Sequence, residues 1–197
     1  MLDRLEKYDL LPWLINTYNC KIGVEVGVRD GSNAKNLLEK TKMTLVGVDI
    51  YVYPQIQGII ESCNGRFSLY NGYSIRMSEY FGEESLDWIY LDAGHTYPDV
   101  SADIEAWWPK LKTGGIFCGD DYCNCWNPQE GLYEVVRAIE EFIEDKDIVL
   151  HISGIGVVDK QTRLDYANKI GKLHEDNFTG RKRTEDVPVP QWWFIKG

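Results

Sequence analysis

Short apolar runs rich in β-branched residues alternate with helical stretches along most of this 197-residue chain. Residues 22–27 and 44–49 are two such runs, and a stretch of helical period lies between them. This alternation predicts βαβ units and a parallel sheet, which places the chain in the α/β class. The length suits one domain, and we detect no internal repeat, so we expect a single domain over residues 1–197.

Hydrophobic period and helix-boundary residues predict where each element lies. The expected strands cover residues 22–27, 44–49, 66–70, 86–91, 115–119, 147–152 and 192–195. The expected helices cover residues 3–18, 32–41, 54–63, 74–81, 97–111 and 131–144. Ser32 or Asn33 is expected to cap the second helix. Pro54 is expected to begin the third, and Gly114-Gly115 to stop the fifth.

Residues 154–190 do not fit the alternation. This stretch is polar and contains Arg181-Lys182-Arg183. We expect an irregular insertion here, because long loops are usually functional or disordered. Two interpretations stay open: a solvent-exposed loop before the last strand, or a lid over a substrate.

The charge balance argues against two classes of partner. The net charge is −10, whereas non-specific nucleic-acid binding and docking on anionic membranes both need a basic face. No apolar run approaches the roughly 20 residues that span a bilayer, and the first residues predict a charged amphipathic helix, not a signal peptide. We therefore expect a cytoplasmic protein that binds neither nucleic acid nor membrane.

Five cysteines are present, and in the cytoplasm we expect them to be reduced. Cys118, Cys123 and Cys125 cluster in the sequence. Their spacing matches no common zinc finger, so packing residues are the simpler interpretation and a zinc site the alternative.

Polar or glycine residues follow five of the expected strands. They are Glu25–Gly31, Asp49, 71–74, 92–95 and Asp120-Asp121. Because ligands bind outside the carboxyl ends of parallel strands, these residues predict one binding site at one edge of the sheet.

Gly27 and Gly31 suit a tight strand-to-helix turn that a ligand approaches closely. The helix behind the turn offers free N–H groups to a carboxylate or phosphate. Asp49 lies 22 positions after Gly27, where an acidic side chain can bind a ribose diol, or it can simply cap the strand end. The spacing differs from the Gly-x-Gly-x-x-Gly of dinucleotide-binding turns, which disfavours a nicotinamide-dependent oxidoreductase.

Glu25-x-Gly27-x-x-x-Gly31 with Asp49 resembles the binding motifs of class I S-adenosylmethionine-dependent methyltransferases. Asp92-x-x-His95, and Gly114-Gly115 followed by Asp120-Asp121, narrow the resemblance. They resemble the small metal-dependent O-methyltransferases that include sugar and macrolide-sugar enzymes, with catechol O-methyltransferases as more distant relatives. The resemblance covers about residues 20–125 and the final strand. It implies a Rossmann-like seven-stranded sheet, six strands parallel and one antiparallel, flanked by helices.

The resemblance also implies a role for each matching residue. Those expected to bind S-adenosylmethionine are Glu25, Gly27, Gly31, Asp49, Ile50, Tyr51, Tyr73, Ser74 and Asp92. Glu25 and Gly27 would hold its methionine part, and Asp49 its ribose. Ile50 or Tyr51 would lie beside the adenine, and Tyr73 and Ser74 would line the adenine pocket.

The resemblance further implies that Asp92, Asp120 and Asp121 bind a divalent cation and that His95, with Asp92, is catalytic. Three converging carboxylates repel one another unless a cation or a proton intervenes. Oxygen ligands select a hard ion, so Mg²⁺ is expected, with Mn²⁺ or Ca²⁺ as alternatives. A nearby imidazole can accept the proton of a cation-activated hydroxyl, which makes His95 the expected general base. The alternative for Asp120 or Asp121 is a loop cap.

These expectations combine into S-adenosylmethionine- and metal-dependent O-methylation of a small-molecule or glycan acceptor, with a sugar hydroxyl favoured. The alternatives are a catechol-like phenolic acceptor and a non-catalytic binding domain with the same fold. The oligomeric state stays open, and a homo-oligomer is one of the alternatives.

Overall fold

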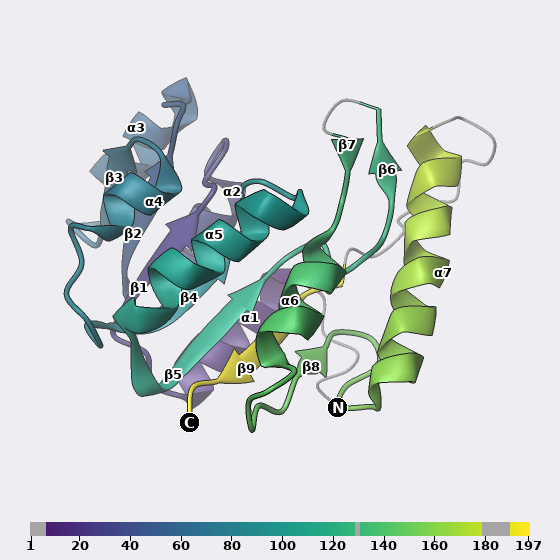
Figure 1. Ribbon diagram of the computed structural model, residues 1–197. Helices are drawn as coiled ribbons and strands as arrows, with labels where there is room; N and C mark the ends of the chain where they lie inside the picture. The colour runs from purple at the N-terminus through teal and green to yellow at the C-terminus, as the bar shows by residue number, and fades with distance from the viewer. Residues whose placement is uncertain (1–6, 129–130, 179–189) are drawn as a thin grey trace.

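The computed structural model describes residues 7–128, 131–178 and 190–197. Its centre is a seven-stranded sheet with the order β3-β2-β1-β4-β5-β9-β8 (Figure 1). The strands are β1 (Ile22–Val26), β2 (Thr44–Asp49), β3 (Phe67–Asn71), β4 (Leu86–Leu91), β5 (Leu111–Gly119), β8 (His151–Ile152) and β9 (Trp192–Ile195). Neighbouring strands pair in parallel from β3 to β5, and β9 pairs antiparallel with both β5 and β8. The predicted sheet, with one strand running against the others, is confirmed.

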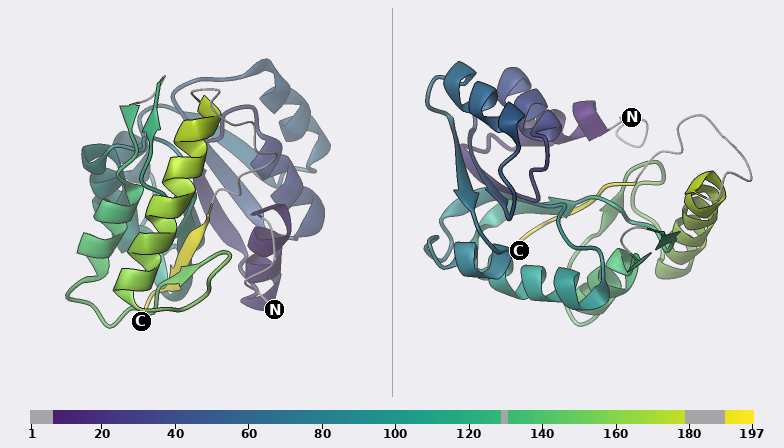
Figure 2. Two further views of the ribbon diagram at one scale, coloured as in Figure 1. Left: turned by 90° about the vertical axis from the view of Figure 1, so that its right-hand side faces the viewer. Right: turned by 90° about the horizontal axis from the view of Figure 1, so that it is seen from above.

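Helices cover both faces of this sheet (Figure 2). They are α1 (Lys7–Thr17), α2 (Ser32–Lys40), α3 (Pro54–Ser62), α4 (Ser74–Ser78), α5 (Tyr97–Trp107), α6 (Val135–Ile143) and α7 (Lys160–Phe178). In the view from above, α1, α2 and α3 lie on one side of the sheet and α5 and α6 on the other, while α7 stands beyond the edge. Of the helices described here, none has the length and apolar character to cross a membrane.

The core lies in two layers because successive residues of a strand point to opposite faces. In β4, Ile89 belongs to the layer under α5 and α6, whereas Trp88 and Tyr90 belong to the layer under α1, α2 and α3. All three side chains are fully buried. A strand buried on both faces reads as one apolar run, which is why its bounds agree with the sequence prediction.

Two predicted boundaries around β5 are wrong. The helix predicted over residues 97–111 ends at Trp107 and continues as a short 3₁₀ turn, η2 (Trp108–Lys110). Pro109 explains this ending, since proline has no N–H to continue α-helical hydrogen bonding. The strand then begins at Leu111, so Gly114-Gly115 lie inside β5 and do not stop the helix.

Three further elements are shorter than predicted by several residues. The helix predicted over 131–144 is α6, which begins at Val135, because Gly131–Leu132 instead forms strand β7 and pairs with β6 (Trp126–Asn127). The strand predicted over 147–152 is only β8, because its pairing with β9 extends over just two residues. The predicted strand 66–70 lies one residue later, as β3, and the predicted helix 74–81 ends at Ser78.

The expectation of an irregular insertion at 154–190 is also wrong for its described part. Residues Lys160–Phe178 form α7, a 19-residue helix. Only a narrow strip of α7 is buried, including Ala167 and Ile170, so the sequence carries little helical periodicity. The basic run at 181–183 lies outside the described residues.

Candidate active site

The carboxyl ends of five strands meet at one edge of the sheet, as expected. Val26 at the end of β1 pairs with Leu91 at the end of β4, and Leu91 pairs with Gly119 at the end of β5. On the other side, Asp49 at the end of β2 pairs with Asn71 at the end of β3. The residues that follow these strands therefore share one edge.

The turn after β1 lies directly against the backbone that follows β4. Gly27 has φ +87°, and a Cβ built on it would lie 2.0 Å from the carbonyl oxygen of Asp92. No other residue type fits here without displacing that backbone. The two halves of the predicted site, the glycine turn and the Asp92–His95 segment, are thus in direct contact.

Glu25 is buried in β1, with 1% of its surface exposed. Its Oε1 accepts a hydrogen bond of 2.9 Å from Nδ2 of Asn33 on α2. The predicted capping of α2 by Ser32 or Asn33 is therefore wrong: the N-cap residue is Gly31, at φ +82°, with no side-chain capping bond. Asn33 instead holds Glu25. The position of Asn33 in the first turn of α2, directly behind the glycine turn, is the feature of the sequence that indicates its contact with Glu25.

Asp49 organises the glycine turn. Its Oδ2 accepts the N–H groups of Val28 at 2.9 Å and Arg29 at 2.7 Å, and its Oδ1 accepts that of Tyr51 at 2.8 Å. These three bonds fix the turn. A carboxylate has about four acceptor positions, which leaves room for a ribose hydroxyl. The contact of Asp49 with a ribose stays a prediction.

Side chains beyond β2 and β3 divide into exposed and internal ones. Ile50, Tyr51 and Tyr73 are exposed to 49%, 66% and 75%. Ser74 differs, since its hydroxyl accepts a 2.8 Å hydrogen bond from Nε1 of Trp107 and faces α5. Any contact of Ser74 with a cofactor would therefore come from its backbone, whereas the three exposed side chains are open to a ligand.

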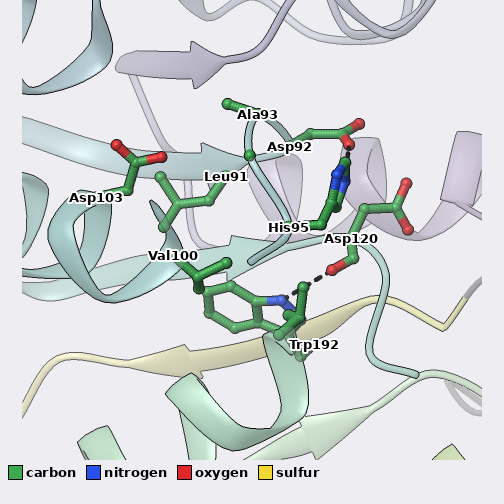
Figure 3. A pocket seen from close by; sticks show the side chains of 10 residues that line it. Leu91, Asp92, Ala93, His95, Val100, Asp103, Asp120 and Trp192 are labelled. Atoms are coloured by element: carbon green, nitrogen blue, oxygen red, sulfur yellow. Dashed lines mark hydrogen bonds and ion pairs between the residues drawn. The ribbon is translucent and has the colours of Figure 1, made fainter. Parts of the chain in front are cut away.

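Asp92, His95 and Asp121 converge at the same edge. Nε2 of His95 lies 2.8 Å from Oδ2 of Asp121 and 3.9 Å from Oδ1 of Asp92. One ligand atom from each residue lies within 4.8 Å of the others. Asp121 has φ +57°, a conformation that costs energy for a non-glycine residue and is often found at functional sites. Figure 3 shows Asp92 and His95 pointing toward one another.

Asp120 lines a small pocket together with Asp92 and His95, but it is not part of the trio. Its Oδ1 accepts hydrogen bonds of 3.0 Å from Nε2 of Gln191 and from the N–H of Asp121. Its carbonyl oxygen accepts one from Nε1 of Trp192, drawn in Figure 3. The role of Gln191 had no signal in the sequence, because it comes from the far end of the chain.

The environment of His95 combines burial with negative charge. Burial disfavours the imidazolium, but hydrogen bonds to Asp121 and Asp92 outweigh it and raise the pKa of His95 to about 10. One face of the imidazole stacks on Tyr133, with ring centroids 4.2 Å apart and planes 5° from parallel. Tyr133 comes just after β7, and the sequence did not single it out. The ring is therefore fixed in orientation.

The predicted cysteine cluster is divided. The thiol of Cys118 donates to the carbonyl oxygen of Ile89 within the sheet. The Sγ atoms of Cys123 and Cys125 contact each other at 3.7 Å. Among the described residues, Asp92, His95 and Asp121 are the one group of three or more possible ligands whose geometry suits a metal ion.

Residues 22–122 match a protein family described as a methyltransferase domain. The chain belongs to this family. The methyltransferase class implied by the resemblance of the glycine turn and Asp49 is thereby confirmed. The matched segment runs from β1 to the residue after Asp121, so it contains every strand end of the site. A search of curated proteins gives no match.

Several solved structures share the fold of this methyltransferase. The O-methyltransferase TomG from Streptomyces achromogenes, involved in tomaymycin synthesis, was solved in complex with S-adenosylmethionine; it is 12% identical, with a TM-score of 0.64 over 95% of this chain and 78% of that one. An O-methyltransferase from Bacillus cereus, in complex with S-adenosylhomocysteine, is 14% identical, with a TM-score of 0.59 over 94% and 79%. A putative rRNA-methylase from Clostridium thermocellum is 12% identical, with a TM-score of 0.64 over 98% of both chains. At these identities the likeness establishes the fold and leaves the acceptor open.

Proposed function

We propose that this methyltransferase transfers the methyl group of S-adenosylmethionine to a hydroxyl of a sugar or glycan, with a divalent cation at the acceptor. The observation that carries the proposal is the convergence of Asp92, His95 and Asp121, whose ligand atoms lie within 4.8 Å of one another. The cofactors bound to TomG and to the Bacillus cereus enzyme support the choice of methyl donor.

The glycine turn is the cofactor half of the proposed site. Glu25 and Gly27 bind the methionine part, and Gly31 lets the chain turn into α2, whose first N–H groups face the ligand. Asp49 binds the ribose hydroxyls while it holds the turn. The exposed side chains of Ile50, Tyr51 and Tyr73 cover the adenine, and the backbone of Ser74 completes the pocket.

The donor set fits a divalent cation. Carboxylate oxygens of Asp92 and Asp121 suit Mg²⁺, Mn²⁺ or Ca²⁺, and in this proposal Nε2 of His95 is the proton acceptor and not a ligand of the cation. Asp120 lines a pocket with Asp92 and His95 and is the proposed third ligand, although its Oδ1 accepts a hydrogen bond from Gln191. When bound, the cation offsets the two carboxylates, which favours neutral His95, and lowers the pKa of an acceptor hydroxyl.

Methyl transfer from a sulfonium is an in-line displacement, so the protein chiefly has to align the acceptor oxygen with the methyl carbon and sulfur. Asp92 contributes to both halves, since its backbone packs on Gly27 and its side chain faces His95. His95 accepts the hydroxyl proton at Nε2, with the ring held by Tyr133. Trp126, five residues after Asp121 and 52% exposed, offers a flat surface for the apolar face of a sugar.

The decisive experiment is calorimetric titration of S-adenosylhomocysteine into the protein, with Mg²⁺ and again with EDTA. Micromolar binding in both conditions is expected, because the cation belongs to the acceptor half. Absence of binding in both would refute the cofactor assignment.

A screen of sugar and catechol acceptors with Mg²⁺ tests the acceptor class. Turnover with sugars is expected, and turnover with catechols alone would favour a phenolic acceptor. Asp92→Asn should abolish turnover at nearly unchanged cofactor affinity. Asp145→Asn, at an exposed position between α6 and β8, is the matched control and should retain both.

A further inference from the structure

Helix α7 lies along the segment that carries Asp121. We call residues 121–127 the Asp121 loop. The N–H of Asn124 donates to the carbonyl oxygen of Ala167 at 3.4 Å, and Nδ2 of Asn124 donates to Oδ1 of Asn168 at 2.9 Å. Further along, the N–H of Trp126 donates to Oε1 of Glu175 at 2.9 Å. Figure 1 shows α7 beside β6, the strand that forms the end of this loop. The loop is thus bonded to α7 at successive turns of the helix.

Gly171 permits the closest approach between α7 and the Asp121 loop. A Cβ built on Gly171 would lie 1.7 Å from the carbonyl oxygen of Asn124 and 2.5 Å from its carbonyl carbon. Both atoms are backbone, so no side-chain rotation relieves the overlap. Glycine inside a helix costs about 1 kcal/mol relative to alanine. Its only occurrence in α7 is at this contact, which indicates that the approach itself is needed.

A buried charge network holds the start of the same loop. The hydroxyl of Tyr122, the residue after Asp121, donates to Oε1 of Glu140 on α6 at 2.5 Å. Nε and one terminal nitrogen of Arg163 on α7 donate to the two oxygens of Glu140, at 2.6 and 2.9 Å. The Arg163 and Glu140 side chains are only 11% and 5% exposed. Such a bidentate pair fixes geometry as well as charge.

We propose that α7 is the positioning element of the active site, with Gly171 and Arg163 as positioning residues that seat the Asp121 loop. The Asp121 carboxylate faces His95 at 2.8 Å only while its residue keeps a left-handed backbone conformation, which the contacts of the following residues with α6 and α7 maintain. This role rests on the proposed function, because it assigns α7 to the cation and acceptor half of that site. The cofactor half, built on β1 and β2, has no part in these contacts.

The test is Gly171→Ala, with Gly58→Ala as the matched control. Gly58 is also inside a helix, α3, but a Cβ there would meet nothing within 4 Å. Relieving the overlap at Gly171 requires a shift of more than about 1 Å. A misplacement of that size lowers the reaction rate at an active site by about 100-fold.

The readouts are Mn²⁺ affinity from the electron paramagnetic resonance signal of free Mn²⁺, S-adenosylhomocysteine affinity by calorimetry, and hydrogen–deuterium exchange. Gly171→Ala should weaken Mn²⁺ binding by about tenfold or more and speed exchange in residues 119–128. It should leave S-adenosylhomocysteine affinity and exchange in residues 22–49 unchanged. Gly58→Ala should leave every readout unchanged.

Wild-type exchange and Mn²⁺ affinity in Gly171→Ala would overturn the proposal. Equal losses in both halves would also overturn it, since they would mean a general structural role. If wild-type protein binds no Mn²⁺, the cation half of the proposed function fails, and the exchange pattern alone still decides the role of α7. Should Gly171→Ala not fold, Asn168→Ala removes one bond to Asn124 and should give the same pattern with smaller changes.

Discussion

Asp103 is a buried carboxylic acid whose ionisation should oppose folding at neutral pH. It lies on α5 with 7% of its surface exposed. Desolvation, assisted by repulsion from Asp99, raises the pKa of Asp103 from 3.8 to about 6, although a hydrogen bond with Ser74 acts in the opposite direction. The folded protein therefore binds this proton more tightly than the unfolded chain does.

The sign of the effect follows from proton linkage. Between pH 3.8 and about 6 the native state holds the Asp103 proton that the unfolded state has released, so the free energy of unfolding falls as pH rises through this window. The gap between the two pKa values lowers the free energy of unfolding by about 3 kcal/mol above pH 7 and by about half of that near pH 5. Below both pKa values the ionisation of Asp103 has almost no effect on stability.

Asp103→Asn removes the ionisation and keeps an oxygen that can accept the Ser74 hydrogen bond. It should raise the free energy of unfolding by up to about 3 kcal/mol near pH 8, and by about half as much near pH 5. Urea unfolding at both pH values measures this, with an unchanged m-value as the check that only stability has moved. Glu105→Gln, on the exposed side of the same helix, is the control and should change stability little at either pH. A loss of stability at pH 8, or an equal gain at both pH values, would refute the reasoning.

Three further predictions concern the site and its support. His95→Ala should slow methyl transfer about 10²- to 10⁴-fold at unchanged S-adenosylhomocysteine affinity; an unchanged rate across pH, measured in single-turnover assays, would remove it as general base. Gly27→Ala should abolish S-adenosylhomocysteine binding in calorimetry, because its methyl group would lie 2.0 Å from the carbonyl oxygen of Asp92; wild-type affinity would contradict this. Arg163→Met should lower the free energy of unfolding by about 3–5 kcal/mol, since it leaves the buried carboxylate of Glu140 without its cation, although the Tyr122 hydroxyl still donates to it. Arg163→Lys should recover part of the loss in the same urea titration.

The sequence predicts best those strands of the sheet that are buried on both faces. The bounds of β2, β4 and β9 agree with the prediction, since a continuous apolar run has a sharp beginning and end. Elements at the periphery are predicted less well. Helix α7 buries only a narrow strip, and the β6–β7 hairpin pairs over two residues on each strand, so tertiary contacts and not local pattern determine both.

The same distinction explains which parts of the candidate site the sequence revealed. Asp92, His95 and Asp121 follow strand ends, and parallel register alone places strand ends on one edge. What orients them comes from contacts that no local pattern encodes. Gln191, which holds Asp120, is 71 residues away in the sequence, and Arg163 acts through Glu140, 23 residues before it. Sheet topology thus determines which residues meet. The last two elements of the chain, α7 and β9, determine how the side chains of those residues are oriented. A sequence pattern predicts the sheet topology but not these orienting contacts.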